Sequence, residues 1–127
     1  MKVLTQKNVE FLHNSLIKKF GGISGIRDVG ALESAIKSPF QTFDGAELFK
    51  NIFEKAARLG FGILQNHPFL DGNKRTALHS MLVFLLANDI ELSYNDSEIV
   101  KLVYDIASGK AGESELLEWI LKSDWDW

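Results

Sequence analysis

Residues 67–77 read HPFLDGNKRTA, and this stretch joins the two strongest helical patterns of the chain. Before it, apolar residues recur at three- and four-residue steps, which predicts a long helix over about 46–65. That helix should end before Pro68, because a proline disfavours helical geometry in the residue that precedes it. After it, a helix over about 73–88 is apolar nearly all round beyond its first turn, which predicts the central position in the bundle. The stretch is therefore a tight loop that leads into the N-terminus of a buried helix.

The rest of the chain shows shorter helical patterns separated by glycine and proline. A first helix, capped by Thr5 or Asn8, should run to about Phe20. Residues 21–30 contain four glycines and should form a loop or a short hairpin. Further helices are expected over 31–36, 97–107 and 113–122, and the tail 123–127 has no clear role. Strand signals are weak, so the sequence predicts an all-α fold: a single domain over 1–127, built as an irregular bundle of about six helices.

Composition limits the class of protein. The 127 residues fit one domain, and the absence of cysteine excludes disulfides and thiolate metal sites. A net charge of −3 provides no general basic field, so we expect no direct binding of nucleic acid. The N-terminus is polar, which is not typical of a secretory signal. The most apolar run, 81–87, is too short to span a membrane. We therefore expect a cytoplasmic protein with no membrane contact.

The start of the helix after the loop is a candidate anion site. A helix N-terminus carries unpaired N–H groups and a partial positive charge, and Gly72 lets a ligand approach the backbone closely. Lys74 and Arg75 lie in the first turn of the helix. A cation there is repelled by the helix dipole, at a cost of about 0.3–1 kcal/mol in helix stability for each residue. A bound polyphosphate would reverse that effect, because the cations and the N–H groups would face one anion. The residues thus favour phosphate binding, although pairing with surface acids is the alternative.

Two further side chains of the loop suit phosphate chemistry. Asp71 can cap the helix or hold Mg²⁺, which proteins commonly bind through one or two carboxylates and substrate phosphates. His67 can be a plain helix-end residue or a general base for a hydroxyl group. Phe69 should turn inward and hold the loop against the core. His13 and His79 are expected to be ordinary helix residues.

The stretch 67–77 closely resembles the signature of the Fic/Doc superfamily, and with Lys at position 74 it resembles the Doc (death-on-curing) branch. Residues 21–36 and 53–57 resemble that branch as well. The resemblance implies the all-helical Fic fold, with His67 as the general base and Asp71 as the ligand of Mg²⁺. It assigns the phosphates of the nucleotide to Gly72, Asn73, Lys74 and Arg75. Residues 21–36 match the flap that docks the target protein, with Gly22, Gly25, Arg27 and Asp28 as the candidate docking residues; Arg27 and Asp28 could also simply stabilise a turn.

Two positions separate the chain from most Fic adenylyl transferases, which have glycine in place of Lys74 and a second arginine in place of Leu78. Members of the Doc branch share these changes, bind the nucleotide in the reverse orientation and transfer its γ-phosphate. The resemblance therefore implies a kinase that uses ATP with Mg²⁺, with a threonine of elongation factor Tu as its target and arrest of translation as the outcome. An AMP transferase and a non-enzymatic partner-binding module are the alternatives.

Many Fic proteins inhibit themselves through a helix with a Ser/Thr-x-x-x-Glu-Gly/Asn motif. Ser114 and Glu118 have that spacing, but Trp119 follows them, so no internal inhibitor is expected. Doc-like toxins are instead restrained by a separate cognate antitoxin, and the resemblance implies such a partner here.

Overall fold

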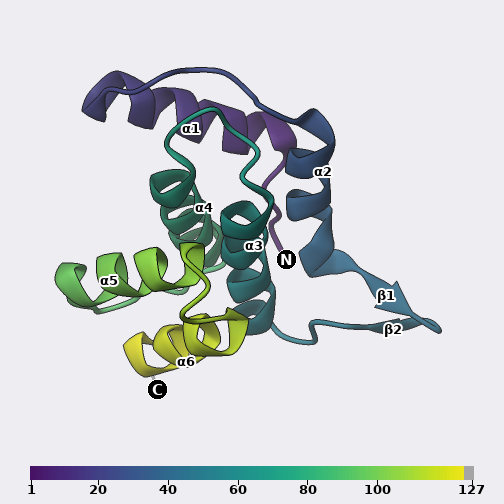
Figure 1. Cartoon of the computed structure of the whole chain (residues 1–127). Helices are drawn as coiled ribbons and strands as arrows, with labels where there is room; N and C mark the ends of the chain where they lie inside the picture. The colour runs from purple at the N-terminus through teal and green to yellow at the C-terminus, as the bar shows by residue number, and fades with distance from the viewer. Residues whose placement is uncertain (125–127) are drawn as a thin grey trace.

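The structure of the protein, a computed structural model, describes residues 1–124 and has an all-α architecture (Figure 1). The described part of the chain contains the helices α1 (Gln6–Phe20), α2 (Val29–Lys37), α3 (Ile52–Asn66), α4 (Asn73–Ala87), α5 (Asp96–Ala107) and α6 (Glu113–Ser123). A short 3₁₀ helix, η1 (Ser38–Phe40), follows α2, and a small hairpin is formed by β1 (Thr42–Phe43) and β2 (Ala46–Glu47). The expected helix bundle is confirmed. The tryptophans of the tail, Trp125 and Trp127, lie outside the described residues.

Helix α3 holds the centre of the bundle, not α4 as the sequence suggested. It packs against α2, η1, α4, α5 and α6, while α1 lies across α4 (Figure 1). Small residues explain the difference, because glycine permits neighbouring chains to approach closely. A Cβ at Gly62 would lie 3.3 Å from Ala35 Cα, and one at Gly60 would lie 3.2 Å from Met81 Sδ. On α4, by contrast, Leu86 remains 59% exposed.

The expected start of the central helix was wrong by six residues. Residues 46–51 are not helical. They form β2 and a bend, and α3 begins only after Asn51, which caps it by accepting a hydrogen bond from Glu54 N at 2.9 Å. The hairpin turns at Asp44 and Gly45, whose φ angles are 53° and 81°. Positive φ at both central residues is the mark of the tight hairpin turn that Asp-Gly favours. The local turn chemistry thus prevailed over the apolar periodicity.

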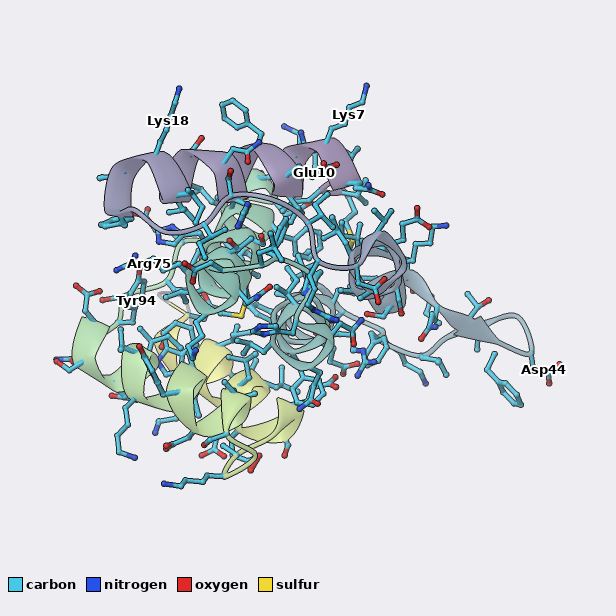
Figure 2. All side chains as sticks on the ribbon, turned by 45° about the horizontal axis from the view of Figure 1, so that its top comes forward. Lys7, Glu10, Lys18, Asp44, Arg75 and Tyr94 are labelled. Atoms are coloured by element: carbon cyan, nitrogen blue, oxygen red, sulfur yellow. The ribbon has the colours of Figure 1, made fainter. Side chains whose placement is uncertain are left out.

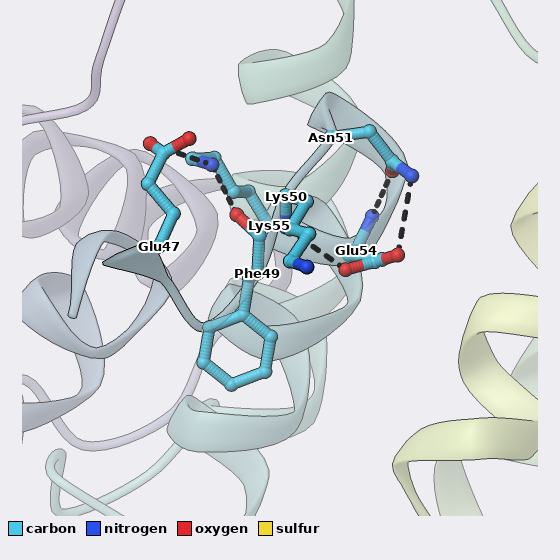
Figure 3. A network of polar contacts seen from close by, with 6 residues as sticks. All are labelled: Glu47, Phe49, Lys50, Asn51, Glu54 and Lys55. Atoms are coloured by element: carbon cyan, nitrogen blue, oxygen red, sulfur yellow. Dashed lines mark hydrogen bonds and ion pairs between the residues drawn. The ribbon is translucent and has the colours of Figure 1, made fainter. Parts of the chain in front are cut away.

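A buried lysine holds the hairpin against the helical body. Lys55 on α3 is only 2% exposed, donates to the carbonyl of Phe49 and pairs with Glu47 Oε1 at 3.2 Å (Figure 3). The hairpin itself is exposed and projects from the helices, with Asp44 at its tip (Figure 2). Lys55 therefore fixes the chain between hairpin and helix.

The remaining element ends agree closely with the sequence. Thr5 forms a capping box with Asn8, and Asn95 caps α5. Asp28 caps α2 and starts that helix two residues earlier than expected. The tail was assigned no role, yet Ser123 belongs to α6 and its carbonyl accepts from Ser93 N at 2.8 Å. Within the described residues, no helix has the length and apolar character needed to cross a membrane.

Candidate active site

The loop between α3 and α4 is held by its own residues. Helix α3 ends at Asn66, and the next residue, His67, caps it in the left-handed conformation (φ 48°, ψ 55°) with an exposed side chain. Phe69 is buried, as expected. The buried Asn73 side chain bonds twice to the Phe69 backbone: its Oδ1 accepts from the N–H and its Nδ2 donates to the carbonyl, both at 2.9 Å. Because the amide oxygen and one amide N–H are bound to the Phe69 backbone and Asn73 is only 4% exposed, its backbone N–H is the group best placed to meet a phosphate.

The flap lies directly beside this loop. Its first half, residues 21–28, runs antiparallel to residues 68–70, and Ile26 pairs with Phe69. Arg27 N donates to the Pro68 carbonyl at 2.7 Å, and Leu70 N donates to the Gly25 carbonyl at 3.1 Å. The second half of the flap is helix α2. The fold thus brings the two segments together although about 40 residues separate them in sequence.

The two charged residues in the first half of the flap both have structural partners. Arg27 donates from Nε to the His67 carbonyl at 2.6 Å and from Nη2 to the Asn66 carbonyl at 2.7 Å, at the C-terminus of α3. A cation at that end complements the helix dipole. Asp28 Oδ1 accepts from Ala31 N at 3.0 Å. Both residues therefore shape the site, and their role in docking a target stays a prediction.

Asp71 does not cap α4. The cap is Gly72, at φ 77°, which leaves the first turn without a side-chain acceptor. The Asp71 carboxylate instead accepts from Ile23 N (3.0 Å, Oδ2) and Gly72 N (2.9 Å, Oδ1). These two backbone hydrogen bonds lower the pKa of Asp71 most. Desolvation by the surrounding protein raises it, and the charges of His13 and Arg75 lower it further.

The geometry of Asp71 fits a magnesium ligand. Its side chain is exposed and anionic at neutral pH, and each carboxylate oxygen keeps a lone pair beyond the hydrogen bond that it accepts. Among the residues that the structure describes, no group of three or more acidic, histidine or cysteine side chains converges as a metal site. A magnesium ion at Asp71 would therefore take its other ligands from phosphate and water oxygens, as this ion commonly does.

His13 belongs to the site, although the sequence gave it no role. The side chain is 1% exposed, and Nε2 donates to the Asp71 carbonyl at 2.8 Å. Its ring stacks on Phe69 with centroids 3.8 Å apart and planes 6° apart. The available signal was a histidine one turn after the buried Val9, on the face of α1 that packs inward. His13 thus supports both ends of the loop segment 69–71.

A pocket of about 340 Å³ opens at the start of α4. It is lined by Asp71, Gly72, Asn73, Lys74, Arg75, Leu78, Val100, Val103 and Tyr104. The Lys74 ammonium lies 5.0 Å from the ring centroid of Tyr104, and the Arg75 guanidinium lies 4.3 Å from that of Phe20. No ion pair among the described residues involves either cation. The pocket therefore combines the N–H groups of the first turn of α4, two cations without an ion pair, the Asp71 carboxylate and an apolar wall.

The motif and its surroundings also match known proteins. Residues 3–85, about two thirds of the chain and the whole motif with them, match the Fic/DOC family. The chain belongs to the Fic/DOC family. It is 30% identical to "Protein kinase doc" of Escherichia phage P1 over 118 residues, which cover 93% of this chain and 92% of that protein. It is 38% identical to "Toxin Doc" of Mycolicibacterium smegmatis over 74 residues, which cover 58% of this chain and 57% of that protein. These relatives place it in the Doc branch.

Other features of this Fic/DOC chain belong to residues outside 67–77. A larger cavity of about 700 Å³ is lined by Phe53, residues 89–93 and Asp124, and its charged side chains are acidic, which disfavours phosphate. Ser114 bonds to Glu115 and lines a pocket with Leu48 and Phe49, near the start of α3 and so at the opposite end from the motif. His79 is half-buried; burial first, then Lys19 and Arg75, lower its pKa.

Proposed function

We propose that this Fic/DOC chain is a Doc-like toxin that transfers the γ-phosphate of a nucleoside triphosphate, ATP in the first instance, to a hydroxyl group of a target protein. The observation that carries the proposal is the start of α4. Its N-terminal turn has no side-chain cap, and Lys74 and Arg75 line a pocket in which neither forms an ion pair among the described residues. Such a site is completed by a polyphosphate. The full-length similarity to a protein named as a kinase favours phosphate transfer over AMP transfer.

In the proposed reaction His67 takes the proton of the target hydroxyl. The freed oxygen forms a bond to the γ-phosphorus, while the bond from that phosphorus to the β–γ bridging oxygen breaks and the nucleoside diphosphate leaves. Lys74, Arg75 and the N–H groups of the first turn of α4 neutralise the charge that develops on the phosphate oxygens. The exposed imidazole of His67 is accessible to a protein substrate.

Asp71 is the residue that would hold magnesium. Bound there, the ion would neutralise phosphate oxygens and fix the position of the triphosphate. Ile23 N and Gly72 N keep the carboxylate ionised and oriented, since both donate to it. Asp71 thus links the flap to the nucleotide site.

The target and the partner are proposed from the resemblance. A target segment would lie along the flap, whose backbone runs beside residues 68–70, and present a hydroxyl to His67. A threonine of elongation factor Tu is the candidate target, and translation arrest is the expected outcome. A cognate antitoxin is the candidate partner that restrains the toxin.

Labelled ATP separates the possible chemistries. We expect the purified protein with Mg²⁺ and a bacterial cell extract to transfer label from γ-labelled ATP to one protein band, and none from α-labelled ATP. Transfer of the α-label instead would identify an AMP transferase. Absence of both, together with no heat of nucleotide binding in calorimetry, would favour a non-enzymatic binding module.

A pair of histidine variants tests the assigned base. His67→Ala should abolish transfer and leave the thermal unfolding midpoint almost unchanged, because the side chain is exposed. His79→Ala is the comparison variant: His79 is half-buried and is not among the residues that line the pocket, so the variant should lose some stability and retain transfer. Undiminished transfer by His67→Ala would refute the assignment of the base.

A further inference from the structure

We propose that Tyr104 is a positioning residue for Lys74: its ring holds the lysine ammonium at the phosphate pocket without neutralising the charge. The inference rests on the proposed function and deepens it. Tyr104 lies on α5, beyond residues 3–85 that match the Fic/DOC family, so the family signature does not assign it a role.

The contact is direct and belongs to the pocket. The Lys74 ammonium lies 5.0 Å from the centroid of the Tyr104 ring, within the distance at which a cation is attracted to an aromatic face. Both side chains line the same pocket of about 340 Å³. Lys74 is half-buried and Tyr104 is 60% exposed, so the ring forms an outer wall over the ammonium. Helix α5 thus completes a site that begins on α4.

None of the ion pairs among the described residues includes Lys74. Asp105 follows Tyr104 directly, yet its carboxylate pairs with Lys101 on the same helix at 2.9 Å. The other ion pairs of the described residues join Lys55 to Glu47 and Arg58 to Glu113. A carboxylate in place of the ring would hold Lys74 equally well, but it would cancel the charge that a phosphate needs. An aromatic ring restrains the cation and leaves its charge available.

The second cation of the motif also lies near an aromatic ring, although that ring does not line the pocket. The Arg75 guanidinium lies 4.3 Å from the ring centroid of Phe20, the last residue of α1. Phe20 is 49% exposed, as an outer wall would be. The two cations of the motif are therefore each faced by a ring from a different helix. This repetition argues that the rings serve the cations and are not isolated surface aromatics.

The test measures binding of two probes, inorganic tripolyphosphate and a non-hydrolysable ATP analogue, each with Mg²⁺, by calorimetry on the full chain. Tyr104→Leu removes the ring and should weaken both probes by roughly two- to fivefold, the range that a cation–π contact at an exposed site supports. Tyr104→Phe keeps the ring and should bind like the unmodified protein. Phe11→Leu removes an exposed aromatic residue of α1 that lines no pocket described above, and should change nothing.

A double-mutant cycle shows whether Tyr104 acts through Lys74. In a Lys74→Met background, Tyr104→Leu should cause no further loss of affinity for either probe. Thermal unfolding of each variant verifies that the fold is retained, which the exposure of Tyr104 favours.

Each contrary outcome has its own meaning. A loss confined to the ATP analogue would show that Tyr104 contacts the nucleoside, and would overturn a role through Lys74. A loss that persists in the Lys74→Met background would overturn it as well, and so would full affinity of Tyr104→Leu. If the unmodified protein binds neither probe, the proposed function fails first, and the inference falls with it.

Discussion

At the scale of single residues, Gly22 illustrates how closely the flap approaches the candidate metal ligand. A Cβ at this position would lie 2.7 Å from Asp71 Oδ2 and 3.0 Å from Ile17 Cδ1. We expect Gly22→Ala to displace the Asp71 carboxylate and to reduce transfer by about 10- to 100-fold, since small misplacements in a reacting site have effects of that order. The initial rate with γ-labelled ATP, measured over a series of Mg²⁺ concentrations, would report the loss.

Gly21→Ala is the matched control for that variant. Gly21 has φ 85° and Gly22 has φ 123°, so both substitutions strain the backbone by about 1 kcal/mol or more. A Cβ at Gly21 meets no atom within 4 Å, so its strain is not accompanied by a clash. Gly21→Ala should therefore lose stability and keep most of its activity. Equal losses of activity in the two variants would show that backbone strain alone, and not the contact with Asp71, limits the reaction.

His13 allows its two contacts to be tested separately. His13→Gln preserves an N–H donor for the Asp71 carbonyl and loses the stack on Phe69, whereas His13→Phe preserves the stack and loses the donor. We expect His13→Phe to leave a buried carbonyl unpaired and to be destabilised by about 1–3 kcal/mol. Chemical unfolding measures this change, and the Mg²⁺ concentration needed for half-maximal rate should rise. His13→Gln should keep that Mg²⁺ requirement near the original value; a requirement that rises as much as in His13→Phe would argue against the hydrogen bond as the cause.

Some residues of the candidate site could be predicted from the sequence, and others were revealed only by the structure. His67, Asp71 and the turn 72–75 were predicted because they are contiguous, and a loop before a helix keeps neighbours together in space. Their supports come from elsewhere: Ile23 N from the flap, His13 and Phe20 from α1, and Tyr104 from α5. Such long-range contacts depend on how helices pack, which the periodicity of one helix does not reveal.

At the scale of elements, the local sequence predicts some helix starts and fails at another. Thr5 and Asn95 have a capping side chain directly before an amphipathic pattern. Thr5 is one of the two caps expected for α1, and α5 begins at Asp96, one residue before its expected start. The start of α3 was not predicted correctly, because Leu48 and Phe49 continue its apolar spacing although they lie outside the helix. The Asp44-Gly45 turn was the missed signal. Two positive φ angles there direct the chain into a hairpin before any helix can form.

The contacts of Lys55 with Glu47 and Phe49, which hold the hairpin against α3, lead to a prediction. Lys55→Met keeps the volume of the buried stem but leaves the Phe49 carbonyl without its donor. The expected loss in the free energy of unfolding is about 1–3 kcal/mol, because a polar group left unpaired bears the full desolvation cost. Glu47→Gln should lose less than about 1 kcal/mol, since Glu47 is 56% exposed and its ion pair is largely solvated. Urea unfolding of both variants gives the comparison, and equal losses would contradict the assigned role of the carbonyl.

At the scale of the whole molecule, the fold extends beyond the segment that defines the family. The family match ends at residue 85, near the end of α4, yet α5 and α6 contribute Ile99, Val103, Ile106, Leu116, Trp119 and Ile120 to the same buried cluster as α3 and α4. Helix α6 packs along α3, and Ser93 bonds back to Ser123. The C-terminal helices are therefore part of one core, and α5 additionally supplies a wall of the pocket at the start of α4.

This continuity predicts how the chain responds to truncation. A chain that ends at Ser93 would expose the faces of α3 and α4 that α5 and α6 cover, including the space where Leu116 meets Gly60. Because a chain of this size has little stability to spare, we expect the truncated form to lose its cooperative thermal transition and to bind a hydrophobic dye.

In the control, the hairpin residues Thr42–Glu47 are replaced by Asn-Gly. The existing hydrogen bond from Leu48 N to the Gln41 carbonyl (3.0 Å) can then close a tight turn. Those six residues are exposed, so the control should unfold in one transition, followed by circular dichroism and tryptophan fluorescence together. A truncated chain that still unfolds cooperatively would show that α1 to α4 form an independent domain, and the single-domain prediction would then be wrong.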